Sequence, residues 1–202
     1  MFRPLIIFLL FCAMLNLNAL SQMSYRERVQ LHRDTVDAEF ADTSRSILHH
    51  ADIAHFHGLE YFEVNENYRV KAKFRSIKNG KVVIMKTSGS RTPSYRPYGT
   101  LSFKLNGKKL KLTLYQNADP NRPELKNYLL LAFTDRTNGF ETYGGGRYIE
   151  YMVSDVSPEM IVDFNYCFNP YCAYTDGYNC VIPPAENFLD TRIEAGVKKY
   201  HD

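Results

Sequence analysis

Apolar and polar positions follow two different periods along this chain. Over residues 24–42, apolar side chains recur every three or four positions, which predicts an amphipathic helix with a charged opposite face. From Tyr68 onward the period changes to two, which is typical of half-buried β-strands. The sequence therefore predicts an N-terminal helical segment, residues 22–60, packed on a β-rich domain, residues 61–202.

About seven strands are expected, several from the period of two and one, over residues 128–133, from a continuous apolar run. Asn79-Gly80 and Asn106-Gly107 each separate two such segments, and this dipeptide is a strong signal for a two-residue hairpin turn. The predicted strands cover residues 68–75, 82–85, 101–105, 110–114, 128–133, 147–153 and 160–164. Hairpin-linked strands pair antiparallel, so we expect a mainly β fold, either an antiparallel β-sandwich or a small β-barrel.

The beginning of the chain has the pattern of an export signal. Arg3 precedes an apolar run over residues 5–15, and small residues stand at Ala19 and Ser21. This order predicts a signal peptide over residues 1–21. The run is much shorter than the roughly 20 residues of a membrane-spanning helix, so a retained anchor is the weaker alternative. We expect a periplasmic or secreted protein with no membrane span after cleavage.

Composition narrows the classes of function. Charged residues make up 23% of the chain, and 25 basic residues are mixed with 22 acidic ones, which gives a net charge of +3. A nucleic-acid partner is not expected, because no basic block rises above this mixture. The predicted strand over residues 68–75 nevertheless carries a basic outer face. No phosphate-binding P-loop is present, and we expect no cofactor.

Three cysteines remain after the predicted cleavage. In an exported protein we expect a disulfide between Cys172 and Cys180, across a short polar loop, with Cys167 as a buried free thiol. A Cys167–Cys172 bridge is the main alternative, and a catalytic Cys167 is a further one. The histidines of residues 49–57 do not have the spacing of a known zinc motif, so no metal site is predicted, although zinc or copper binding is the alternative.

The most unusual segment is the glycine-rich loop over residues 135–148. Three successive glycines, Gly144, Gly145 and Gly146, let the backbone approach either a ligand or a neighbouring strand closely. Their amides with Arg147 would suit an anion. The alternative is a structural bulge in which Arg147 pairs with a nearby carboxylate.

Two carboxylates stand out as candidates for chemistry. Asp163 lies within an apolar strand, where an acid is either buried and paired or part of a site. We expect it to pair with Arg147. Asp135 and Asp163 together are the candidate catalytic residues for general acid–base hydrolysis, with two structural ion pairs as the alternative.

Several motifs resemble a bacterial family known as domain of unknown function 1684. They are ETYGGGRY at residues 141–148, DFN at 163–165, NPYCAY at 169–174 and CVIPPAEN at 180–187. The resemblance extends over roughly residues 56–198 and implies no activity. It does imply a shared feature formed by the glycine loop, Asp163, Asn165, Cys172, Cys180 and Asn187.

Together these observations favour an exported β-rich protein that binds a small, anionic ligand in a tyrosine- and glycine-lined pocket. The expected ligand-binding residues are Tyr143, Gly144, Gly145, Gly146, Arg147 and Asn165. A carboxylate-based hydrolase and a structural or interaction domain remain as alternatives.

Overall fold

The computed structural model describes residues 23–200. These residues divide into two compact units between Ala38 and Glu39. The predicted signal peptide lies outside the described residues. Helix α2 (Tyr25–Ala41) confirms the predicted helix, and within residues 23–200 no helix is both long and apolar enough to cross a membrane.

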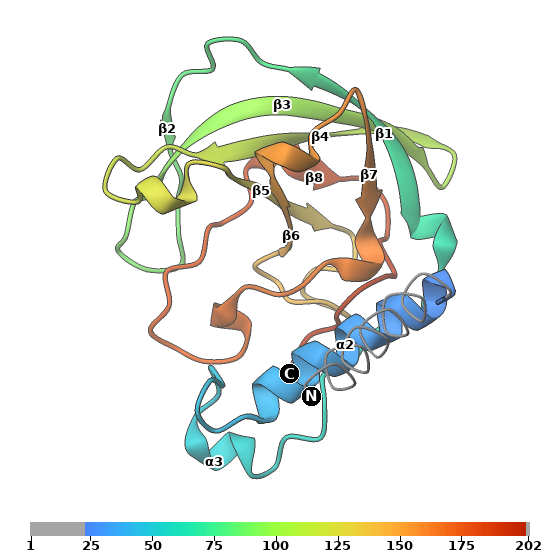
Figure 1. Cartoon of the computed structure of the whole chain (residues 1–202), viewed down its shortest axis with the longest axis vertical. Coiled ribbons are helices and arrows are strands. Elements are labelled where there is room, and N and C mark those ends of the chain that lie inside the picture. Colours follow the sequence, from blue (N-terminus) through green and yellow to red (C-terminus); the bar gives the residue numbers. More distant parts are fainter. Residues whose placement is uncertain (1–22, 201–202) are drawn as a thin grey trace, which may run out of the picture. The chain divides into compact units, whose positions relative to one another are not determined.

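The second unit is built on one curled, mainly antiparallel sheet, a half-barrel, and also contains the short helix α3 (His50–Ile53) (Figure 1). Its strands are β1 (Arg69–Ser76), β2 (Val83–Ile84), β3 (Ser94–Leu105), β4 (Lys108–Asn117), β5 (Tyr128–Asp135), β6 (Arg147–Met152), β7 (Glu159–Asp163) and β8 (Phe188–Leu189). The order is β6-β5-β4-β3-β1-β7, with β2 on β3 and β8 parallel to β5. The predicted mainly antiparallel β class is confirmed, as a single curled sheet.

The two Asn-Gly turns behave differently. Asn106 and Gly107 have φ values of 50° and 75°, as a tight hairpin turn requires, and they join β3 to β4 as predicted. Asn79 has a positive φ, but Gly80 does not. The predicted return of residues 82–85 on β1 is therefore wrong, because β2 pairs with β3 instead.

Side chains alternate across the sheet and give it two different faces. One face carries the main core, which includes Leu101, Leu112, Leu131 and Phe133. The opposite face carries a second cluster over β3 to β6, formed by Tyr95, Tyr115, Leu130, Ala132 and Tyr148 with Met85 and Val181. Strand β5 is thus buried on both faces, which explains its continuous apolar run.

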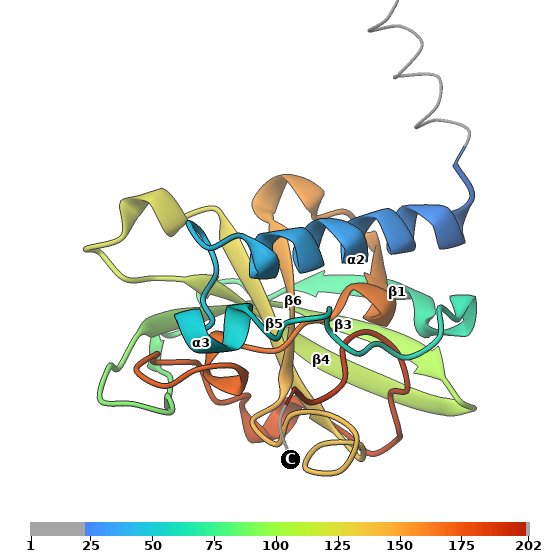
Figure 2. The same ribbon diagram turned by 90° about the horizontal axis from the view of Figure 1, so that it is seen from below.

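Over β1, β3 and the beginning of β4, the face opposite the main core is exposed. Ala72 and Phe103 point into the main core, so their neighbours along each strand point the other way. Figure 2 shows these strands crossing the second unit. The outward side chains of three neighbouring strands are therefore accessible here.

Candidate functional site

The glycine-rich loop is held by a buried carboxylate at the end of β5. Asp135 Oδ1 accepts hydrogen bonds from Thr137 N (2.8 Å), Thr137 Oγ1 (2.7 Å) and Ile193 N (3.1 Å). The first two close the turn that follows β5, and the third fastens the C-terminal segment to it. Asp135 therefore joins two parts of the chain that are distant in sequence.

Arg147, the first residue of β6, completes this buried cluster. Its Nη2 donates to Asp135 Oδ2 at 2.8 Å and to the Ile193 carbonyl at 2.8 Å, and its Nη1 donates to the Ala195 carbonyl at 2.6 Å. The guanidinium lies 5.5 Å from the centre of the Phe133 ring, and the side chain has no exposed surface. Both terminal nitrogens are thus occupied by the protein itself.

Two of the three glycines of the loop lie too close to other parts of the protein to carry a side chain. A Cβ on Gly146, where φ is +90°, would lie 2.5 Å from Pro183 Cγ and 2.7 Å from the Phe133 carbonyl oxygen. A Cβ on Gly145 would lie 2.4 Å from the Tyr143 ring. Gly144 is less restricted, with its closest neighbour at 3.8 Å. At Gly145 and Gly146 the predicted close approach is made to the protein itself.

The expected pairing of Asp163 with Arg147 is wrong. Asp163 Oδ2 lies 3.5 Å from Arg69 Nε, because Asp163 on β7 and Arg69 on β1 stand directly opposite each other in the ladder. Arg147 instead takes Asp135, which lies two residues beyond its own ladder partner Phe133 on β5. The two candidate catalytic carboxylates thus belong to different networks, at strands β5 and β7.

Asn165 is a buried connector of the same kind. Its side chain accepts a hydrogen bond from Asn65 N (3.0 Å) and donates to the Asn65 carbonyl (2.9 Å) and to Asp163 Oδ1 (3.0 Å). The backbone N–H of Asn165 also donates to Asp163 Oδ1, at 3.1 Å. Its polar atoms therefore stabilise the junction between β7 and the segment that leads into β1.

The side chain of Asn187 takes the place of backbone hydrogen bonds between β4 and β5. Strands β4 and β5 pair through Tyr115 and Gln116, but at Thr113 the fully buried Asn187 amide stands between them. Asn187 Oδ1 accepts from Thr113 N (2.7 Å), and Nδ2 donates to the carbonyls of Thr113 (2.9 Å) and Ala132 (2.8 Å). The residues of the resemblance thus form internal contacts of the fold.

The structure contains the predicted disulfide. Cys172 and Cys180 are bonded, and Cys167 is free and buried. Burial raises the pKa of the Cys167 thiol to about 11, so it is a poor nucleophile near neutral pH. Ser88 supports the bridge from the neighbouring loop, since Cys180 N donates to Ser88 Oγ at 3.1 Å.

The remaining candidates also contact the protein. Tyr143 packs against a small cluster that includes Leu48 and Tyr174. His49 Nε2 shares a hydrogen bond of 2.7 Å with Thr175 Oγ1. Within residues 23–200, no three His, Cys, Asp or Glu side chains gather as metal ligands. The assignment of Tyr143, the three glycines, Arg147 and Asn165 to a ligand pocket stays a prediction.

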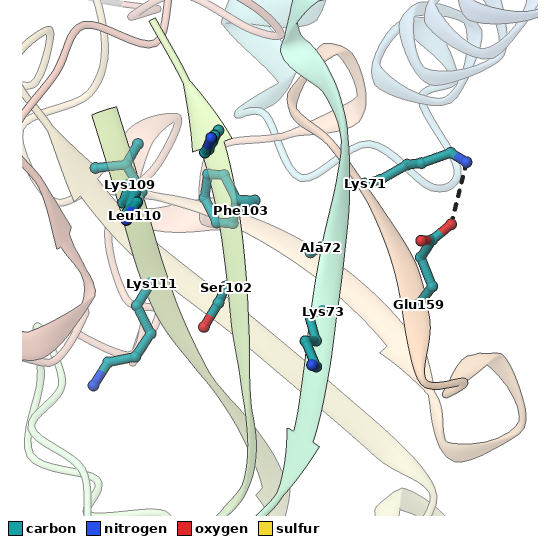
Figure 3. Close-up of a pocket in the computed structure, with 10 residues that line it drawn as sticks. Lys71, Ala72, Lys73, Ser102, Phe103, Lys109, Leu110, Lys111 and Glu159 are labelled. Atoms are coloured by element: carbon teal, nitrogen blue, oxygen red, sulfur yellow. Dashed lines mark ion pairs between the residues drawn. The ribbon is translucent and has the colours of Figure 1, made fainter. Parts of the chain in front are cut away.

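A hollow of about 700 Å³ lies elsewhere, on the exposed face of β1, β3 and β4 (Figure 3). Five lysines line it, and together we call them the lysine face: Lys71, Lys73, Lys104, Lys109 and Lys111. Ser102 lies among them, and Glu159 is the single acidic residue of the lining. The sequence pattern predicted the basic side of β1, but not that β3 and β4 continue it.

The ladder registers order these charges into rows. Lys73 stands opposite Glu159 on one side and Ser102 on the other, and Ser102 stands opposite Lys111. Lys104 stands directly opposite Lys109. Lys71 Nζ forms an exposed ion pair with Glu159 at 3.2 Å, which leaves the positive charge of the face largely uncompensated.

Comparisons with known proteins agree with the motifs. The model of a family described as "Protein of unknown function (DUF1684)" matches residues 54–198. The solution NMR structure of the uncharacterized protein from gene locus rrnAC0354 of Haloarcula marismortui is 34% identical, covers 85% of this chain and 92% of that chain, and has a TM-score of 0.65. No curated protein matches the sequence significantly.

Proposed function

Because the chain belongs to the DUF1684 family, which has no assigned function, we propose a function from geometry: an exported protein that binds a multiply charged anion on its lysine face. The observation that carries the proposal is the gathering of five lysines and one glutamate around a single hollow. The glycine loop is not the anion site in this proposal, because Arg147 is fully buried and bonded to the protein.

The arrangement of the lysines costs stability in the absence of a ligand. Like charges directly opposite each other on neighbouring strands destabilise a sheet, and Lys104 and Lys109 are such a pair. Lysines often protect the edges of sheets from aggregation, but β1, β3 and β4 are all interior strands. A bound anion would turn this repulsion into attraction.

The spacing of the lysines indicates the class of ligand. Neighbouring strands lie about 4.8 Å apart, so the backbones of Lys73 and Lys111, two strands apart, are about 10 Å from each other. One small monoanion cannot reach both ends of such a row. A chain of several phosphate groups can, so we infer a linear polyanion of the condensed-phosphate type.

Removal of three lysines tests the site. We expect Lys104→Gln/Lys109→Gln/Lys111→Gln to bind inorganic polyphosphate at least about tenfold more weakly than the wild type. The slope of log affinity against log salt concentration should become shallower by roughly 0.7 for each lost contact. Titration calorimetry at several salt concentrations measures both. The control Lys78→Gln/Lys86→Gln/Lys126→Gln removes the same charge from exposed positions outside the hollow.

The control variant should bind like the wild type. Equal losses in the two triple variants would show a response to net charge alone and would overturn the lysine face as a site. Absence of binding by the wild-type protein would overturn the proposed function itself.

Export is the second part of the proposal, supported by the apolar run at residues 5–15 and by the Cys172–Cys180 bridge. We expect the full chain, expressed with its own N-terminus, to yield a periplasmic protein that begins at Gln22. Non-reducing peptide mass mapping should also find Cys172 linked to Cys180 and Cys167 free. A membrane-bound species that retains residues 1–21 would contradict export.

A further inference from the structure

We propose that a second surface, formed by residues 82–84 and 171–182, docks the second unit onto the surface of an anionic lipid bilayer. Each of the two segments carries large apolar side chains in exposed positions. We call them the apolar tip: Val82, Val83, Ile84, Tyr171, Tyr178 and Ile182. The tip shares no residue with the lysine face, so its binding can hold or fail independently of the proposed function.

The two segments of the tip are fastened side by side although they are far apart in sequence. Ile182 N donates to the Lys86 carbonyl, and Ser88 N donates to the Cys180 carbonyl, each at 2.9 Å. An antiparallel bridge joins Thr87 to Val181 between these bonds. Both views show the green segment after β2 next to the orange segment before β8 (Figures 1 and 2). The Cys172–Cys180 disulfide closes the second segment into a loop.

Strand β2 has exposed apolar side chains on both of its faces, whereas a half-buried strand exposes one face only. Val83 and Ile84 are consecutive residues of β2, so their side chains point to opposite faces, yet both are exposed, Ile84 to 61%. Tyr171 and Tyr178 pack edge to face, with ring centres 5.1 Å apart, and Tyr171 remains 50% exposed. Exposed apolar side chains on two segments that are joined to each other favour an interaction surface.

The chemistry of the tip suits the interface of a bilayer. Tyrosine has an apolar ring and a polar hydroxyl, and it is enriched where membranes meet water. Exposed Lys81 and Lys86 flank the aliphatic residues 82–84, and long lysine stems let the charge remain among headgroups while apolar neighbours enter the acyl boundary. Such lysines are complementary to anionic lipid.

The same charges argue against a second copy of the chain. A two-fold contact through the tip would bring Lys81 and Lys86 of both copies into one interface, four like charges in all. An anionic lipid surface attracts these lysines instead of repelling them.

Vesicle co-sedimentation of the processed chain, residues 22–202, tests the tip. We expect the wild type to bind vesicles of phosphatidylcholine mixed with phosphatidylglycerol, and to bind pure phosphatidylcholine weakly. Ile84→Ser/Ile182→Ser should reduce binding to the mixed vesicles by about tenfold, because two aliphatic side chains no longer enter the lipid. The control Phe140→Ser/Phe188→Ser removes two other exposed apolar side chains and should bind like the wild type.

Each other result contradicts the proposal. The first is no binding by the wild type, and the second is an equal loss of binding in the control variant. The third is full binding by the tip variant together with a loss of binding in Lys104→Gln/Lys109→Gln/Lys111→Gln, which would assign the lipid to the lysine face. A wild-type dimer in light scattering that Ile84→Ser/Ile182→Ser converts to a monomer would assign the tip to a second copy. Thermal unfolding at the wild-type temperature shows that the variants are folded. Polyphosphate binding is measured in a separate titration, so loss of vesicle binding does not bear on the lysine face.

Discussion

Asparagine in place of Asp135 should lower the free energy of unfolding by about 3–5 kcal/mol, the cost of leaving a buried charge without its partner. Asp135 and Arg147 are both without exposed surface, and their ion pair of 2.8 Å fastens the end of β5 to the beginning of β6. The variant keeps the size of the side chain, so the loss reports charge rather than a cavity. Denaturant unfolding followed by tyrosine fluorescence measures it.

Asp163→Asn is the matched control for this change. Its partner Arg69 has a side chain that is 45% exposed, and an amide at position 163 keeps an oxygen that can accept the bonds from Asn165. We expect a loss of about 1 kcal/mol or less. An Asp135→Asn variant as stable as Asp163→Asn would contradict the structural role of the buried pair. In the double variant Asp135→Asn/Arg147→Met, the loss should be smaller than the sum of the two single losses.

Asn187→Ala should cost about 3 kcal/mol or more, because it removes three hydrogen bonds and leaves the Thr113 N–H and two buried carbonyls unsatisfied. Asn169→Ala is the comparison: this asparagine is also buried, but its side chain donates one bond, at 2.9 Å to the Lys198 carbonyl. We expect about 1 kcal/mol there. Equal losses in the two variants, measured by denaturant unfolding, would contradict the view that the Asn187 amide substitutes for a strand ladder.

The local sequence pattern was sufficient to locate most of the strands, but it did not show which strands pair with each other. The period of two and the apolar run at residues 128–133 located β1 and β3 to β7, and the Asn106-Gly107 dipeptide located the hairpin between β3 and β4. It did not show that β2 pairs with β3, since the φ of Gly80 depends on what lies opposite it. Strand β8, with two residues, is too short to have a period.

The charge partners depended on strand order in the same way. The position of Asp163 in an apolar strand led us to pair it with Arg147, but Asp135 also ends an apolar strand in the structure. Strand β5 is next to β6, whereas β7 is at the other edge of the sheet, and this order decides the pairing. The lysine face was missed for the related reason that it gathers side chains from strands separated by long stretches of sequence.

A signature of glycines and buried polar residues is often taken as a ligand site, and here its contacts are with the protein. Arg147 donates to three carbonyl groups of the C-terminal segment, among them Ile193 and Ala195. Gly146 admits the ring of Pro183. Buried polar residues that replace strand-to-strand hydrogen bonds or hold loops restrict the choice of residue as strictly as a binding site does, because buried polar groups need partners.

The measurement that tests the central claim most directly is an NMR titration of the isotope-labelled protein with inorganic polyphosphate. If the signature residues hold the fold while the lysine face binds the anion, backbone amide shifts should change along residues 71–73, 102–104 and 109–111. The amides of residues 141–148 should remain unchanged. Shift changes centred on Tyr143 to Arg147, with none on β1, β3 and β4, would contradict the account.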